Sequence, residues 1–330
     1  MTQQNATLNF SVVVPAHNAS AFVGPCLRAL LDAGFAPSEI TLVDDASTDD
    51  TCKIAEALGI NVLRCTSRRG AAQARNIAAE ATDGNVLVFV DSDVAVHPDV
   101  KERLSERFGP LGDMDAVFGS YDDKPYRREL VSRIRNLLHH HVHQENAGSI
   151  ASFWTGLGAV RRSAFDACGG FDANQSMMED IELGMRLHRH GFRIFLDPDL
   201  QGTHWKHWSL TGMIRTDLLH RAIPWAKLIL AAGERSSSDF LNVSNEGKVS
   251  VVSVFVSLCA LPIALFSPAL GGVVLAAALC TLAYANRSFL KRLHRLEGWS
   301  TTIAALGVLW VHFLCGGLGY AAVRCRLLRD

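Results

Sequence analysis

The sequence lacks the motifs by which several large protein classes bind nucleotides, metals or nucleic acids. No GxGxxG follows the first predicted strand and no GxxxxGK[ST] occurs in the 330 residues, so a dinucleotide fingerprint and a P-loop are absent. The eight cysteines form no CxxC pair, which fits neither a zinc site nor a secreted disulfide scaffold. The formal net charge of −1 provides no global basic field, so no nucleic-acid partner is expected.

The N-terminus also lacks the features of a signal peptide. The stretch MTQQNATLNFSVVVP has no basic segment and no long apolar segment behind it. Together with the scattered cysteines, this predicts a reducing compartment.

Long uncharged runs are concentrated after about residue 245. Runs 249–266 and 269–285 carry no charge, and in run 301–323 His312 is the only ionisable side chain other than Cys and Tyr. Membrane helices need about 17–25 such residues. We expect three membrane helices here, with a basic loop, NRSFLKRLHRLEGW, between the second and third. A buried helical domain is the alternative.

The chain is therefore predicted to divide into a soluble domain (1–230), a linker (231–248) and a membrane region (249–330). Because basic loops stay on the cytoplasmic side, the soluble domain is expected on the cytoplasmic face of the inner or plasma membrane.

Strand and helix patterns alternate through the soluble domain. Short β-branched runs predict strands at 10–14, 40–43, 61–64 and 86–90, with helical spacing at 20–33, 51–58 and 71–81 between them. This alternation predicts an α/β fold with a mainly parallel sheet and helices on its faces. Ligands of such sheets bind at the carboxyl ends of the strands.

Polar residues follow three of these strands, at 15–18, at Asp44 and Asp45, and at Asp91 and Asp93. Any one such turn is most simply a helix cap, whereas three at one sheet edge indicate a binding crevice. With no glycine-rich cradle, a bound diphosphate needs another source of positive charge. A divalent cation held by carboxylates, Mg²⁺ or Mn²⁺, provides it.

Four motifs in this order, VVVPAHN, LVDDASTDDT, GAAQARNIA and FVDSD, resemble the family 2 glycosyltransferases, which have the GT-A fold. The resemblance continues through WTGLGAVRRSAFDACGGFD (154–172) and MMEDIELGMRLHRHGFRI (177–194) and covers about residues 9–230. The apolar C-terminal segments resemble those of membrane-bound members. The resemblance implies a Rossmann-like GT-A domain followed by transmembrane helices.

For the nucleotide, the resemblance implies a base site in which Asp45 accepts a hydrogen bond from a ring N–H of uracil or guanine. The other residues implied to bind the nucleotide are Pro15, Ala16, His17, Asn18, Arg75, Asp91 and Ser92. Capping of the helix near Thr51 is the alternative role for Asp45, and a solvated helix face is the alternative for Arg75.

For the metal, the resemblance implies Asp93 as a direct ligand and Asp91 as a contact to the ribose or to a metal-bound water. His204 matches a histidine that supplies a further ligand. Its alternative is an interfacial stretch of Trp, His and Lys near the membrane. The cofactor is expected to be Mg²⁺ or Mn²⁺.

For catalysis, the resemblance implies Asp180 as the general base of an inverting transfer, with Glu179 shaping the site. Acids at a helix N-terminus are favoured by the helix dipole in any case, by about 0.3–1 kcal/mol, which is the alternative reading. Candidate contacts to the acceptor or the diphosphate are Trp154, Gly156, Lys206 and Trp225.

One departure from the family bears on the product. Processive members carry a QxxRW motif, but this chain has HRAIPW at 220–225, where Pro224 interrupts the pattern. The sequence therefore favours transfer of a single sugar from a UDP- or GDP-sugar to a lipid or lipid-linked glycan. The competing hypotheses are a sugar nucleotidyltransferase and a non-catalytic membrane scaffold or flipping partner.

Overall fold

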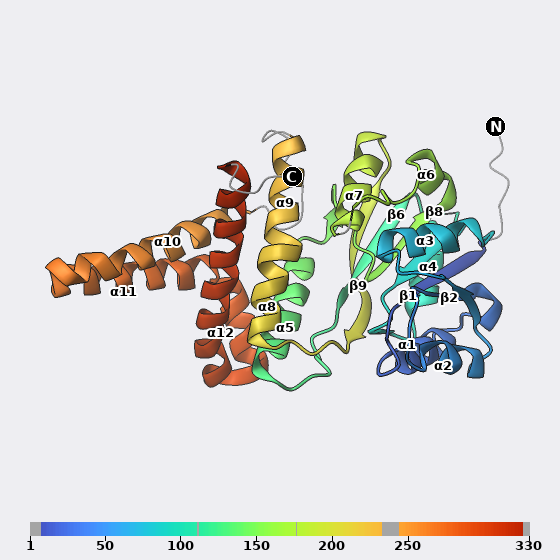
Figure 1. Ribbon diagram of the computed structural model, residues 1–330, viewed down its shortest axis with the longest axis horizontal. Helices are drawn as coiled ribbons and strands as arrows, with labels where there is room; N and C mark the ends of the chain where they lie inside the picture. Colours follow the sequence, from blue (N-terminus) through green and yellow to red (C-terminus); the bar gives the residue numbers. More distant parts are fainter. Residues whose placement is uncertain (1–7, 111, 176, 233–243, 326–330) are drawn as a thin grey trace. The chain divides into compact units, whose positions relative to one another are not determined.

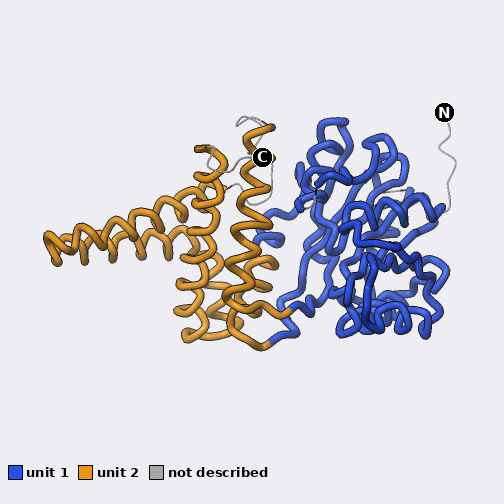
Figure 2. Tube along the Cα trace, viewed as in Figure 1, with its two compact units in different colours: residues 1–127, 142–206 blue, residues 128–141, 207–330 orange. Residues whose placement is uncertain are grey.

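The computed structural model describes residues 8–110, 112–175, 177–232 and 244–325. The chain forms two compact units (Figure 2): an α/β unit of residues 1–127 and 142–206, and a helical unit of residues 128–141 and 207–330. The boundaries at 230 and 248 stay a prediction about domains, and most of the predicted linker lies outside the described residues.

The first half of the α/β unit follows the predicted alternation. Strands β1 (Phe10–Ala16), β2 (Ile40–Asp44), β3 (Asn61–Arg64) and β4 (Val86–Val90) are joined by helices α1 (Val23–Asp32), α2 (Thr51–Ala57) and α3 (Ala71–Glu80). These strands are parallel and lie in the order β3-β2-β1-β4. Their carboxyl ends therefore meet at one edge of the sheet, as the alternation predicts.

The second half of the sheet is mixed. Its strands are β5 (Val94–Val96), β6 (Ala116–Tyr121), β7 (Gly148–Ser149), β8 (Leu157–Arg161) and β9 (Ile194–His204), with helices α4 (Val100–Phe108), α6 (Arg162–Ala167) and α7 (Glu179–Arg189). Strand β8 is antiparallel to both β4 and β6, whereas β6 and β9 are parallel. This mixed sheet with its helices matches the expected GT-A fold, although parallel pairing dominates only its first half.

Side chains on both faces of the sheet are covered. Val12 and Val88 belong to a buried cluster with Leu27 of α1. Phe89 points to the opposite face, since side chains alternate along a strand, and its ring lies 5.1 Å from that of Phe171. Burial on both faces explains why the strands are nearly continuous apolar runs.

The helical unit contains most of α5 (Leu130–Glu145), followed by α8 (Leu210–Arg215), a π-helical segment (Thr216–Ala222) and α9 (Ile223–Ala232). Three long helices complete it: α10 (Asn245–Phe266), α11 (Pro268–Ala285) and α12 (Arg287–Arg324). Helices α10 and α11 lie side by side (Figure 1). All three are long and apolar enough to cross a membrane, which confirms them as candidate spans.

The prediction of a basic loop between the second and third apolar runs is wrong. Residues from Arg287 onward are helical and form the start of α12. Phe289 and Leu293, four residues apart on one helical face, are buried in the unit's core, which stabilises a helix despite the neighbouring charges. Gly298, with φ of +79°, interrupts the helical backbone before the apolar part begins.

A buried ion pair joins three segments of the helical unit. Arg135 of α5 places both terminal nitrogens 2.8 Å from the two carboxylate oxygens of Asp217 in the π-helical segment. His312 of α12 lies 2.8 Å from the same carboxylate through its Nδ1 atom. Arg135 and Asp217 are both buried, so each charge depends on the other for its solvation.

We predict that Asp217→Asn lowers the free energy of unfolding of the helical unit by about 3–5 kcal/mol, because it leaves a buried guanidinium unpaired. Pulsed thiol labelling across a denaturant series measures this, with buried Cys315 reporting on the helical unit and buried Cys26 on the α/β unit. Arg64→Gln is the control, because it breaks a half-exposed pair with Glu56 that contributes about 0–1 kcal/mol. Equal effects of the two variants on the free energy of unfolding would contradict a stabilising role of the buried Arg135–Asp217 pair.

Candidate functional site

The turns after β1 and β2 are tied to each other. The Nδ1 atom of His17 donates to the carbonyl oxygen of Asp45 at 2.7 Å, and the side-chain oxygen of Asn18 accepts from the Thr48 amide at 2.8 Å. Asn18 and Ala46 both have positive φ, of 50° and 60°. Such backbone strain is retained where surrounding contacts enforce it, and it is frequent at ligand sites.

Asp45 is buried and holds the entrance to α3. Its two carboxylate oxygens accept from the amides of Arg69 and Gly70, at 2.6 and 2.9 Å. The acid that binds the start of α2 is Asp49, which accepts from the Thr51 amide at 3.0 Å, and the N-cap residue Asp50 makes no side-chain capping bond. Asp45 thus follows β2 directly, with Pro15 and Ala16 in the adjacent strand β1, and its contact with a nucleotide base stays a prediction.

Arg75 connects the end of β4 with the start of α7. Its Nη2 atom lies 2.8 Å from Oδ1 of Asp91, and its Nη1 atom lies 2.6 Å from Oε1 of Glu179. The Arg75 side chain is only 4% exposed, so the alternative of a solvated helix face is wrong. Burial raises the pKa of the Asp91 carboxyl, and the neighbouring guanidinium opposes this shift.

Asp93 faces a different partner, His204, at the end of β9. The two side chains are 3.6 Å apart, because Val94 pairs with His204 in the antiparallel β5–β9 ladder. Burial raises the pKa of Asp93, but His204 and the charge of Lys206 outweigh it and hold the pKa below its usual value. The His204 ring is stacked on Tyr121, with centroids 4.1 Å apart, which fixes its orientation.

Asp93 and His204 offer one carboxylate oxygen and one imidazole nitrogen, a donor set that suits Mn²⁺ and is compatible with Mg²⁺. Within the described ranges, no three acidic, histidine or cysteine side chains form a ready cluster for a metal ion. Asp91, the other predicted ligand, is paired with Arg75. Asp93 and His204 alone would therefore form an incomplete set of ligands for a divalent cation.

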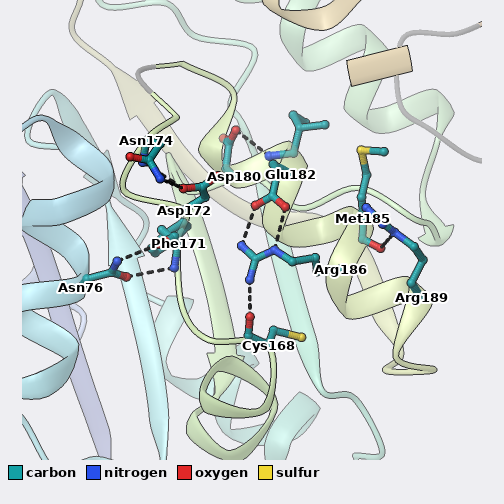
Figure 3. Close-up of polar contacts among 11 residues, drawn as sticks. Asn76, Cys168, Phe171, Asp172, Asn174, Asp180, Glu182, Met185, Arg186 and Arg189 are labelled. Atoms are coloured by element: carbon teal, nitrogen blue, oxygen red, sulfur yellow. Dashed lines mark hydrogen bonds and ion pairs between the residues drawn. The ribbon is translucent and has the colours of Figure 1, made fainter. Parts of the chain in front are cut away.

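Asp180 lies in the first turn of α7 (Figure 3). Its carboxylate accepts from the amides of Ile181 at 2.8 Å and, at 3.4 Å, Thr155. Burial, followed by the charge of Glu179, raises the pKa of Asp180 to about 7, and Arg75 opposes that rise. A carboxylate with this pKa exchanges protons near neutral pH, as a general base requires.

The remaining predicted residues are placed as follows. Gly156 accepts through its carbonyl oxygen from the Asp91 amide at 3.2 Å, and a Cβ atom at Gly156 would overlap the Trp154 ring. Ser92 lies between Asp91 and Asp93, and Lys206 follows His204 by two residues on an exposed segment. Trp225 lies in α9 of the helical unit, and its contact with an acceptor stays a prediction.

Two supporting residues were not predicted from the sequence. Tyr121 orients His204, and Asn76 holds Phe171 through two hydrogen bonds, of 2.8 and 2.9 Å, to its backbone (Figure 3). Asn76 directly follows Arg75 and Tyr121 ends a buried strand, so both stand beside predicted features. Their partners are 95 and 83 positions away in the sequence, a distance that periodicity cannot bridge.

Comparison with known proteins agrees with this geometry. Residues 11–169 match the model of the glycosyl transferase family 2. The glycosyltransferase AglD of Haloferax volcanii is 28% identical over 241 residues, which are 68% of this chain and 37% of AglD. The O-antigen chain rhamnosyltransferase WbaN of Salmonella anatum is 26% identical over 66% of this chain and 74% of its own length.

Among solved structures, the mannosyltransferase PcManGT of Pyrobaculum calidifontis, in complex with GDP-Man and Mn²⁺, is similar in fold. It aligns with a TM-score of 0.58 and 18% identity, over 96% of this chain and 87% of that protein. This likeness, together with the order of the strands, establishes the GT-A fold.

We predict that Asp180→Asn stabilises the protein more at about pH 8 than at about pH 5. The folded-state pKa of about 7 exceeds the roughly 3.9 of an unfolded Asp. The stability that protonated Asp180 contributes is therefore complete below about pH 4 and is lost as the pH rises through 7. Thermal unfolding at the two pH values measures the difference, with Asp50→Asn, at an exposed side chain, as control. A gain in stability that does not depend on pH would refute the raised pKa.

Proposed function

Since the chain belongs to glycosyl transferase family 2 and has the GT-A fold, we propose that it is a membrane-anchored inverting glycosyltransferase. It moves one sugar from a UDP- or GDP-sugar to a lipid or lipid-linked glycan, with Asp180 as the general base and Mg²⁺ or Mn²⁺ as the cofactor.

The observation that carries this proposal is the contrast between the surroundings of two acids, Asp93 beside His204 and Asp180 beside Glu179. The pKa of Asp93 is held low beside His204, so this carboxylate stays ionised and is ready to bind a cation. The pKa of Asp180 is raised to about 7 by burial and by Glu179, so this carboxylate can receive a proton. Environments that push the pKa values of two acids apart are characteristic of sites that use each acid for a different role.

On the donor side, His17, Asn18 and Asp45 stand at the carboxyl ends of β1 and β2, where the base of the nucleotide would lie. Asp93 and His204 would hold the divalent cation. When bound, this cation supplies positive charge to the diphosphate of the donor and makes it a better leaving group. The mannosyltransferase PcManGT, of the same fold, was crystallised with GDP-Man and Mn²⁺, which supports this assignment.

On the acceptor side, Asp180 takes the proton from the acceptor hydroxyl as its oxygen attacks the anomeric carbon of the sugar. The bond between that carbon and the diphosphate oxygen breaks, and the diphosphate leaves with both electrons. Attack from the face opposite the leaving group inverts the anomeric carbon. Trp154 and Gly156 stand near Asp91 and are proposed to border the acceptor, whereas Lys206 is proposed to meet the diphosphate.

The acceptor is proposed to be a lipid or a lipid-linked glycan, because three candidate membrane helices belong to the same chain. The similarity to WbaN, named an O-antigen chain rhamnosyltransferase, supports a glycan acceptor. We place the α/β unit on the cytoplasmic side of the inner or plasma membrane, where nucleotide sugars are available. Trp225 of α9 is proposed to border the entrance for the acceptor.

We predict that one nucleoside diphosphate binds the detergent-purified protein only when Mn²⁺ is present. Calorimetric titrations of UDP and GDP, with CMP and TDP for comparison, measure this with and without the metal. Asp93→Asn should weaken binding more than about tenfold, since losing a ligand costs at least as much as losing a ligand's outer partner. Asp99→Asn, at a half-exposed pair with Arg103, is the matched control. Absence of binding by all four nucleotides would rule out a UDP- or GDP-sugar donor.

We further predict that Asp180→Asn lowers kcat by about 10²–10⁴-fold and leaves nucleotide affinity unchanged. The rate is measured as transfer of radiolabelled sugar to membrane lipids, from a nucleotide sugar whose nucleotide is the one that binds in the titrations. Calorimetry measures the nucleotide affinity. A variant that transfers sugar at the wild-type rate would disprove the role of Asp180. A variant that loses transfer but keeps full function in cells would indicate the scaffold hypothesis instead.

A further inference from the structure

The Arg75 guanidinium binds two carboxylates that come from opposite sides of the site. Its Nη2 atom reaches Asp91, which follows β4 on the donor side, at 2.8 Å. Its Nη1 atom reaches Glu179, which begins α7 on the acceptor side, at 2.6 Å. Because the guanidinium is planar and rigid, the two bonds fix the positions of the two carboxylates relative to each other.

The surroundings of Arg75 hold it in place. It is buried, and its Cζ atom lies 5.7 Å from the centre of the Phe171 ring. The next residue, Asn76, binds the Phe171 backbone through both its amide nitrogen and its amide oxygen (Figure 3). Gly170, with φ of +71°, allows that approach, since a Cβ atom there would lie 2.9 Å from the Asn76 oxygen. Two adjacent residues of α3 therefore fasten the segment that leads to α7.

The charges around Asp180 make this bridge important. Glu179 is the neighbouring acid, Arg75 is the nearby cation, and the other polar contacts of Asp180 are the backbone amides of Thr155 and Ile181. Glu182, the third acid in the first turn of α7, is paired with Arg186 at 2.6 Å (Figure 3). Without Arg75, Glu179 and Asp180 would be adjacent, half-buried acids that compete for one proton.

We propose that Arg75 is the positioning residue of this site: it holds Asp91 and Glu179 in one fixed arrangement and thereby keeps Asp180 as the carboxylate that receives the acceptor's proton. This inference rests on the proposed function, and it assigns to Arg75 a role beyond contact with the nucleotide. Arg75 acts through the two acids and does not itself touch the reacting atoms.

The test compares the two partners of one ion pair, because their removal has opposite electrostatic effects on Asp180. Arg75→Gln removes a positive charge, which favours the protonated form of Asp180, so the acid limb of kcat/KM should move to higher pH by at least about one unit. Glu179→Gln removes a negative charge, so the same limb should move to lower pH. The double variant should return towards the wild-type profile, and Arg75→Lys should shift the limb less than Arg75→Gln.

Arg162→Gln is the matched control. Arg162 donates to the carbonyl oxygens of Gly84 and Ala79 in the same unit. Its loss affects stability without changing the charge around Asp180, so the pH profile should stay unchanged. Shifts in the same direction for Arg75→Gln and Glu179→Gln, or no shift in either, would overturn the positioning role. If Arg75→Gln fails to fold, Arg75→Lys and Glu179→Gln still give the comparison.

A second measurement needs no catalysis and separates this inference from the proposed function. The stability difference between the wild type and Asp180→Asn grows with pH and then levels off, and the pH at which it levels off reports the folded-state pKa of Asp180. Repeating the comparison in the Arg75→Lys and Glu179→Gln backgrounds should move that pH upward and downward, respectively. A wild type that transfers no sugar but shows these shifts would refute the proposed function and support the bridge. If the wild type transfers sugar but the two variants do not shift that pH, the proposed function stands and the positioning role of Arg75 is refuted.

Discussion

The buried Arg75 guanidinium is the interaction on which the candidate site depends. Asp91, Asp93, Glu179 and Asp180 bring four carboxylates to one region, and such acids repel one another unless cations stand between them. Arg75 stands between Asp91 and Glu179, with contacts of 2.8 and 2.6 Å. Asp93 is left facing His204 and Asp180 is left half-buried beside Glu179, so two acids of one type acquire opposite protonation behaviour.

The fold brings these residues together by two different routes. The parallel strands β1, β2 and β4 collect the turns at 17–18, 45 and 91–93 at one sheet edge, as the alternation of strands and helices requires. The antiparallel β5–β9 ladder then brings His204 opposite Val94, next to Asp93. Helix α7 begins at Glu179, so the helix N-terminus and the Arg75 charge act on the same acids. The two routes converge on one short stretch after β4.

The helical unit follows a different physical logic. Its long helices expose apolar side chains such as Leu265 and Phe266, at 84% and 92% exposure, as helices that face lipid do. Two polar side chains that it buries, Arg135 and Asp217, pair with each other, and His312 binds the same carboxylate, so the contact joins three segments. The candidate spans were predictable from composition alone, because length and lack of charge are local properties. The helical start of α12 was not predictable in this way, because burial of Phe289 stabilises a helix there despite the basic residues around it.

The sequence by itself determined the α/β alternation, the strand ends that carry the polar turns, the order of the four motifs and the candidate spans. All of these are short-range patterns of side-chain type, and they can be recognised because side chains repeat with a period of 3.6 residues in a helix and 2 in a strand. Only the tertiary structure decided that β8 enters antiparallel, that Asp45 holds the Arg69–Gly70 turn, and that Arg75 joins Asp91 to Glu179. Arg75 and Glu179 are 104 positions apart. A contact between them depends on chain packing and burial, which no local pattern encodes.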